Sequence, residues 1–269
     1  MRAKLSKKLI FELYSKIISA IVGIESFILI FVEIPNEYRF IVALVTVFIF
    51  VLVFVLVLIY SYKLKQIQID LCGVCVTIMF GDLFSENGNK VISCNEYFDS
   101  TVDDVLISSN TLNGYVLNTY INDITDFDEK IKNDSGCKAN IVGLNSNKTL
   151  GKQIIYKLGT CFKYDQFIFV AFTKFTDSYQ AYLNLPDYYF TLANFWTELN
   201  RVYNGEDVVI PLMGSGITRL ENNSITKEQQ LQILIDSLKY SNLSFAHNSK
   251  ITIVLSENLK NQIRLFNIR

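Results

Sequence analysis

The strongest pattern in the chain is an uninterrupted apolar run near its N-terminus. Residues 40–60, FIVALVTVFIFVLVFVLVLIY, contain no charged residue, glycine or proline. As a helix this run would rise about 31 Å, which matches the hydrocarbon core of a bilayer at about 30 Å. A buried strand is much shorter than this run. The pattern therefore predicts a membrane-spanning helix.

A second apolar segment precedes this run. Residues 17–34, IISAIVGIESFILIFVEI, carry one charge in their middle, Glu25, and a short polar turn at 35–39 joins the two segments. They predict a transmembrane hairpin within residues 1–65. A cleaved signal peptide is the alternative for the first segment, but no small-residue cleavage site follows it and a second span comes at once. A carboxylate in mid-span is costly in lipid, so we expect Glu25 to face the shared interior of a homo-oligomer and to serve its effect on the membrane.

The remaining residues, 66–269, have the pattern of a globular domain. Short β-branched or continuous apolar runs predict strands, several of them buried on both faces. These runs lie at 66–71, 74–80, 91–93, 153–157, 167–172, 208–211 and 251–255.

Helical periodicity separates several of these strands. In residues 185–203, LPDYYFTLANFWTELNRVY, apolar residues recur three or four positions apart behind Pro186, which suits a first helical turn. A second helix is expected from Thr226, where Gln229 is placed for a capping box, and a third from Ser256 to the end of the chain. The alternation predicts an α/β fold, a three-layer α/β/α domain with helices on both faces of a mixed central sheet.

Charge and cysteine content narrow the classes of function. The formal net charge is −1, so no bulk basic field favours nucleic acid as a partner. Lysine and arginine gather before the first span and after the second, while the connecting turn carries only Arg39. The positive-inside rule therefore predicts a multi-pass protein of the inner (plasma) membrane with both termini in the cytoplasm. Cys72 and Cys75 form a lone CxxC in a strand-like stretch, and His247 is the single histidine, so we expect neither a metal nor a redox site.

Two loops follow predicted strands at the positions where open α/β sheets bind ligands. The first, GDLF, contributes Asp82 and Leu83 as candidate ligand contacts. The second, within residues 91–116, has a Ser/Asn-rich turn that opens a helix and can present hydroxyls and N–H groups to an anion; plain helix capping is the alternative. Its candidate residues are Ser108, Ser109, Asn110, Thr111 and Gly114.

A third loop ends the stretch VVIPLMGSGITRL, residues 208–220. It is neither a Walker A site nor a GxGxxG motif. Its glycines allow the backbone to curl, with a positive φ expected at Gly216, and to point N–H groups at an anion; simple turn formation is the alternative. The candidate contacts are Gly214, Ser215, Gly216, Ile217, Thr218 and Arg219.

The order of these stretches resembles the macro domain, a family that binds ADP-ribose. GDLF, VISCNEYFDS, a helix-opening polar loop and IPLMGSGITRL follow one another across residues 66–269. The resemblance implies a macro-like domain in which Asp82 holds the adenine amine, Asn95 lies near the distal ribose, and the two other loops clasp the pyrophosphate.

Two spans ahead of such a domain look like the membrane effector of type II Thoeris anti-phage systems. The stretches FIFVAFTKF and AYLNLPDYYFTLANFWTELNR carry this resemblance further. It implies a sensor of an adenine dinucleotide that a TIR-domain enzyme makes from NAD, either imidazole adenine dinucleotide or an ADP-ribose derivative. The sensor would then oligomerise and disrupt the membrane, which leads to cell death.

The chain departs from the macro pattern in two stretches. SSNTLNG replaces the usual glycine run, and SCNEYFDS only partly matches the usual NAAN. A membrane-anchored ADP-ribosyl hydrolase, or an enzyme that processes ADP-ribose derivatives, is the alternative function. Hydrolysis needs a positioned base, Asn95 is not one, and we expect the nearby carboxylates to be solvated surface. These carboxylates are Glu96, Asp99, Asp103 and Asp104. The sequence thus favours a ligand-sensing effector without catalytic residues, cofactor or metal.

Overall fold

The protein divides into two compact units. A computed structural model describes residues 6–71, 73–216, 219–220, 225–241 and 249–268, with the backbone alone at 219–220. One unit runs from Gln66 to Gln262. The other combines the N-terminal residues up to Lys65 with the C-terminal residues from Ile263.

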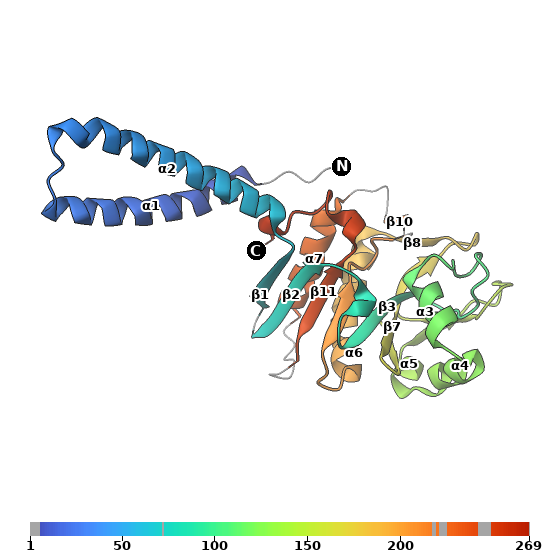
Figure 1. Ribbon diagram of the computed structural model, residues 1–269. Coiled ribbons are helices and arrows are strands. Elements are labelled where there is room, and N and C mark those ends of the chain that lie inside the picture. Colours follow the sequence, from blue (N-terminus) through green and yellow to red (C-terminus); the bar gives the residue numbers. More distant parts are fainter. Residues whose placement is uncertain (1–5, 72, 217–218, 221–224, 242–248, 269) are drawn as a thin grey trace. The chain divides into compact units, whose positions relative to one another are not determined.

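Two long antiparallel helices form most of the N-terminal unit (Figure 1). Helix α1 spans Lys7–Phe31 and α2 spans Asn36–Lys63, so both predicted apolar helices are confirmed. Helix α1 begins ten residues before the predicted span 17–34 and ends three residues short of it, whereas α2 extends beyond 40–60 at both ends. Each is long and apolar enough to cross a membrane, and most of their large apolar side chains are exposed. The Thr46 hydroxyl of α2 donates a hydrogen bond to Glu25 Oε1 of α1 at 3.0 Å, so the mid-span carboxylate has a partner inside the hairpin.

The last residues of the chain belong to this same unit. Asn267 Oδ1 accepts a hydrogen bond from the backbone N–H of Ser6, the N-cap residue of α1, at 2.9 Å. The Arg264 guanidinium lies over the Tyr62 ring of α2, 5.3 Å from its centroid. The C-terminal tail, residues 263–268, therefore holds both the start of α1 and the end of α2.

The second unit is built on a mixed sheet. Its strands are β1 Gln66–Leu71, β2 Val74–Phe80, β3 Asn89–Asn95, β6 Cys161–Tyr164, β7 Phe167–Phe175, β8 Ala181–Leu183, β9 Val208–Pro211, β10 Arg219–Leu220 and β11 Ile251–Leu255. Their order is β1-β2-β11-β9-β3-β7-β8-β10, and β6 also pairs with β7. The central neighbours β2, β11, β9, β3 and β7 are all parallel. Strand β1 runs antiparallel to β2, and β6 and β8 run antiparallel to β7, while β10 is parallel to β8.

Helices cover both faces of the sheet, as the sequence predicts. They are α3 Leu112–Tyr120, α4 Ile124–Asn133, α5 Ser135–Ala139, α6 Leu185–Val202 and α7 Lys227–Lys239. Side chains of β7 alternate between the two faces of the sheet. Phe169 belongs to the core cluster with α3, α4 and α5, whereas Phe172, three positions on, packs edge-on against Tyr188 of α6 on the other face. A two-stranded sheet, β4 Ile141–Leu144 with β5 Ile154–Tyr156, follows α5. The green helices α3, α4 and α5 gather near β3 and β7 in Figure 1.

Local sequence signals predict most, but not all, of the helices and strands of this unit correctly. Every predicted strand is present, and the capping box of Thr226 and Gln229 opens α7 as expected. The helix expected from Ser256 onwards is wrong, because the chain there makes only two short 3-10 turns, η3 Glu257–Leu259 and η4 Leu265–Asn267. Asparagine is a weak helix former, and the Asn267 side chain is engaged by Ser6 instead.

Candidate functional site

A cavity of about 570 Å³ lies at one edge of the sheet. The strands β2, β11, β9, β3 and β7 are parallel neighbours, so their carboxyl ends meet at this edge, and residues at or just beyond the end of each strand line the cavity. This is where open α/β sheets place their ligands.

The cavity opens where two central strands separate. β3 and β9 are paired only at Asn89 with Val208 and at Lys90 with Val209. β3 nevertheless continues to Asn95 and β9 to its own end, so the two strands diverge towards their carboxyl ends. Residues from both diverging ends line the space between them.

One end of the cavity is formed by the loops after β2 and β11. The N–H of Gly81 donates to the Leu255 carbonyl at 3.0 Å, which holds the two loops side by side. Asp82 is exposed, and its Oδ1 accepts a hydrogen bond from the Phe84 N–H at 3.1 Å. Ser256 and Asn258 line the same cavity as Asp82. Sequence reasoning missed them because it extended a helix from Ser256.

The loop that opens α3 is tightly organised. Thr111 caps the helix by accepting from the Gly114 N–H at 3.0 Å, and its hydroxyl donates to the Ser108 carbonyl at 2.7 Å. A Cβ on Gly114 would lie 2.3 Å from that carbonyl oxygen, so this glycine permits the close approach of loop and helix. Both the N–H and the hydroxyl of Ser109 donate to Asp104 Oδ1, and these bonds lower the pKa of the Asp104 carboxyl.

Buried polar side chains hydrogen-bond to the loop after β9, which contains Gly214 and Gly216. The Met213 carbonyl accepts from Gln230 Nε2 at 2.7 Å and from the Tyr188 hydroxyl at 3.2 Å. Gly214 has φ +75°, whereas Gly216 does not have a positive φ, so the expected position of the left-handed residue is corrected by two residues. A Cβ on Gly216 would meet no atom within 4 Å.

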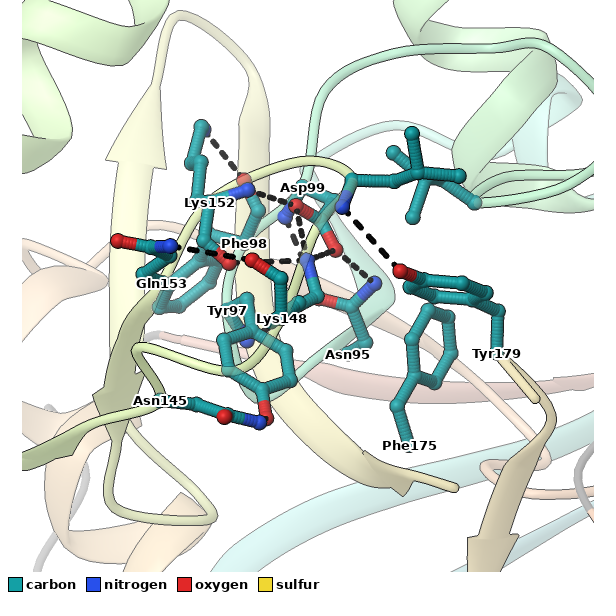
Figure 2. A network of polar contacts seen from close by, with 12 residues as sticks. Asn95, Tyr97, Phe98, Asp99, Asn145, Lys148, Lys152, Gln153, Phe175 and Tyr179 are labelled. Carbon is teal, nitrogen blue, oxygen red and sulfur yellow. Dashed lines mark hydrogen bonds and ion pairs between the residues drawn. The ribbon is translucent and has the colours of Figure 1, made fainter. Parts of the chain in front are cut away.

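The end of β3 carries a buried polar network (Figure 2). Asp99 was expected at the surface, and this is wrong: its side chain is fully buried and pairs with Lys148 Nζ at 2.9 Å. Asn95 Nδ2 donates to Asp99 Oδ2 at 3.1 Å, while Asn95 Oδ1 accepts from the N–H groups of Tyr97 and Asp99. The loop of residues 145–152 folds over this carboxylate and buries it, and no local pattern in the sequence indicates that contact.

Most of the sequence-predicted contacts come together around this cavity. Those that line it are Asp82, Leu83, Asn95, Ser108, Asn110, Thr111, Gly214, Ser215 and Gly216. Ser109 and Gly114 do not line it, because the first is bound to Asp104 and the second packs under the loop. Ile217 and Thr218 lie outside the described residues, as does the side chain of Arg219.

The electrostatic character of the lining is nearly neutral. Among the described residues that line the cavity, Asp82 is the one carboxylate, and none is lysine or arginine. Burial raises the pKa of the Cys94 thiol to about 12, so this cavity-lining cysteine is a neutral thiol that donates weakly to Asn113 Oδ1. The donors that this lining can offer to an anion are therefore backbone N–H groups, hydroxyls and asparagine amides.

Two comparisons with known proteins decide the family. The model of the Thoeris protein ThsA macro domain matches residues 76–256. The Thoeris protein ThsA of Bacillus amyloliquefaciens (strain Y2) is 34% identical over 244 residues, which cover 89% of this chain and 82% of that protein. This chain belongs to the Thoeris ThsA family. The resemblance to the macro domain and to Thoeris effectors is thus confirmed.

Solved macrodomains of Oceanobacillus iheyensis are also similar to this ThsA-family chain. The macrodomain with ADP is 10% identical, with a TM-score of 0.47, over 74% of this chain and 93% of that one. The same macrodomain with MES bound is 10% identical, with a TM-score of 0.43, over 71% and 88%. The ThsA family assignment itself rests on the sequence matches.

Proposed function

We propose that this ThsA-family chain is the membrane effector of a Thoeris defence system. Its cavity binds an adenine dinucleotide that a TIR-domain enzyme makes from NAD, either imidazole adenine dinucleotide or an ADP-ribose derivative. Binding causes the chains to oligomerise through the membrane hairpin and to disrupt the membrane, which stops the infected cell. The observation that carries this proposal is the amide-rich cavity, nearly free of charged side chains, at the carboxyl ends of five parallel strands in a chain that also has two long apolar helices.

The cavity can accommodate the parts of a dinucleotide in a definite order. Asp82 accepts hydrogen bonds from the adenine amine at the end formed by the loops after β2 and β11. The backbone around Gly214–Gly216 and the start of α3 provide N–H groups for the pyrophosphate, and both are devices that bind anions without a cationic side chain. Asn95 lies at the end of β3, where the distal part of the ligand would extend.

Several observations favour sensing over hydrolysis. Of the four carboxylates considered as bases, none lines the cavity in the described structure. Asp99 is locked in its ion pair with Lys148, and Asp104 is held by Ser109. Hydrolysis needs a base within hydrogen-bond reach of the attacking water, so binding without turnover fits this lining better.

The membrane part of the proposal follows from the charges near the helix ends. Arg2, Lys4, Lys7 and Lys8 lie before α1 or in its first turn, and Lys63 and Lys65 lie at the end of α2 or just after it, whereas Arg39, near the start of α2, is the one basic residue at the opposite end of the hairpin. We infer that α1 and α2 cross the inner membrane with both termini in the cytoplasm, where the nucleotide signal is made. The macro unit then has direct access to that signal.

The decisive experiment identifies the bound nucleotide. The full chain is purified in detergent after co-expression with a TIR-domain enzyme, and nucleotides released by denaturation are analysed by mass spectrometry. We expect an adenine dinucleotide in stoichiometric amount, and none after co-expression with a TIR enzyme that lacks its catalytic residue.

Two outcomes would contradict the proposal. One is the absence of bound nucleotide with the active TIR enzyme. The other is the release of ADP-ribose from an ADP-ribosylated protein incubated with the purified chain, which would instead support the hydrolase.

A further inference from the structure

The buried ion pair behind Asn95 has a consequence for the ligand. Asp99 and Lys148 are 2% and 7% exposed, and neither lines the cavity, whereas Asn95 does. Burying a lysine and a carboxylate costs several kcal/mol per ion, which their attraction repays only when the geometry is good. We therefore expect this ion pair to hold neighbouring groups in a fixed geometry.

Every hydrogen-bonding position of the Asp99 carboxylate is used. Oδ1 accepts from Lys148 Nζ at 3.1 Å and from the Lys152 N–H at 2.7 Å. Oδ2 accepts from Lys148 Nζ at 2.9 Å and from Asn95 Nδ2 at 3.1 Å. Figure 2 shows Asp99 at the centre of these contacts. The carboxylate thus ties the end of β3 to the loop 145–152.

Lys148 is anchored from several sides. Its Nζ also donates to the Lys152 carbonyl at 2.8 Å and lies over the Tyr97 ring, 4.3 Å from the centroid. The loop that carries it is fixed further by Tyr179, whose hydroxyl oxygen accepts from the Leu150 N–H at 3.2 Å. The cation is held in place, and so is the carboxylate it faces.

These contacts fix the orientation of the Asn95 carboxamide. Its Oδ1 accepts from two backbone N–H groups and its Nδ2 donates to a carboxylate. A flipped amide would set oxygen against the Asp99 carboxylate and NH₂ against two N–H donors, so both sets of bonds would be lost. In the described part of the chain, the second N–H of Nδ2 has no protein partner, and it is the one group of this side chain left for a ligand.

We propose that Asp99 and Lys148 are positioning residues that make Asn95 a donor-only contact for the distal part of the ligand. The ligand must then offer a hydrogen-bond acceptor there, such as a hydroxyl oxygen of a second ribose. This inference rests on the proposed function, because it assumes that a nucleotide occupies the cavity. It adds that the ion pair selects for ligands that extend beyond the pyrophosphate.

The test compares two ligands that differ only in the distal part. Calorimetry on the full chain in detergent measures the affinity for ADP-ribose and for ADP. The double variant Asp99→Asn/Lys148→Met removes both buried charges together, so neither is left unpaired. We expect ADP-ribose to bind about tenfold more weakly, as for the loss of one hydrogen bond, and ADP to change by less than about twofold.

Two further variants separate positioning from folding. Asn95→Ala should cause a similar selective loss, and combining it with the double variant should cause no additional loss, because both act through one contact. Tyr179 is half-exposed, and Tyr179→Phe removes the hydroxyl that holds the loop 145–152 without changing any charge. This variant should reduce the affinity for ADP-ribose selectively, but by a smaller factor.

A matched control uses a different ion pair of the same unit. Arg201 pairs with Glu198 on α6 at 2.8 Å, and neither residue lines the cavity. Glu198→Gln/Arg201→Met should leave the ratio of the two affinities unchanged.

The possible failures can be told apart. If the parent binds both ligands equally, or if the double variant loses both in the same proportion, the positioning role is overturned. If the parent binds neither ADP-ribose nor ADP, this inference is overturned, whereas the proposed function stands or falls on the nucleotide recovered after co-expression with the TIR-domain enzyme.

Discussion

At the scale of single residues, the two glycines of the loop after β9 have different roles. Gly214 adopts φ +75° and is crowded, because an added Cβ would lie 3.0 Å from Gln230 Nε2 and 3.3 Å from the Phe172 ring. Gly216 has neither constraint, and an added side chain would enter open space beside the cavity. The backbone conformation requires the first glycine, whereas the second borders open space at the cavity.

This difference predicts opposite phenotypes for two substitutions. Gly214→Ala should lower the free energy of unfolding by about 1–2 kcal/mol, the cost of a left-handed residue with a Cβ. Gly216→Val should leave thermal stability unchanged and weaken the binding of ADP-ribose and ADP alike by at least about tenfold, because the side chain fills the phosphate position. Thermal unfolding and calorimetry on the full chain measure both. Unimpaired nucleotide binding by a folded Gly216→Val variant would show that these glycines form a turn and nothing more.

At the scale of elements, a polar contact joins the two helices of the hairpin. Thr46 of α2 donates to Glu25 of α1, each in the apolar part of its helix. Polar contacts between membrane helices set their register and are worth about 0.6 kcal/mol on average. The contact therefore contributes to the alignment of the two helices, and on our proposal the Glu25 carboxyl also faces a shared polar interior between copies.

Two substitutions of Glu25 separate the hydrogen bond from the charge. Glu25→Gln keeps an oxygen that can accept from Thr46 but removes the charge, and Glu25→Leu removes both. On our proposal that the charge of Glu25 serves the effector step, we expect both variants to bind nucleotide like the parent and both to lose toxicity when the TIR enzyme is active. Colony counts and calorimetry are the measurements. Full toxicity of Glu25→Leu would exclude any role of this residue in the effector step.

At the scale of the whole molecule, the chain itself links the cavity to the hairpin. Ser256, Asn258 and Leu259 line the cavity, and only four positions after Leu259 the chain joins the unit that contains α1 and α2. There Asn267 accepts from the Ser6 N–H at the start of α1. A ligand that shifts the loop after β11 thus acts on a segment whose continuation holds the first helix.

This connection predicts that the tail transmits the signal. Asn267→Ala leaves the Ser6 N–H without its acceptor and should reduce toxicity while nucleotide affinity stays within about twofold. Asn267→Asp keeps an acceptor oxygen at the same place and should retain toxicity, so it is the matched control. Toxicity and binding are measured as for Glu25. Parent-like killing by Asn267→Ala would mean that the tail anchors the chain without carrying the signal.

Much of the architecture was determined by the sequence alone. An apolar run of about 20 residues predicts a helix long enough to cross a membrane. A short β-branched run such as 208–211 predicts a buried strand without reference to its neighbours in the fold. Local chemistry also fixed the start of α7, because Thr226 and Gln229 cap it reciprocally. The loops that follow β2 and β9 were identified for the same reason: their residues come directly after a recognisable strand.

Only the tertiary structure decided the features that depend on distant residues. Asp99 looked like a solvated acid because its partner, Lys148, lies 49 positions away. Ser256 and Asn258 reach the cavity because β11 pairs with β2 and β9, a pairing that no local pattern reveals. The tail beyond Ile263 carries helix-like spacing but ends as a turn, because Asn267 binds Ser6 from the other end of the chain. Local propensity determines which segments form helices and strands. Whether a charged side chain or a chain end is buried depends instead on the distant partner that the fold places against it.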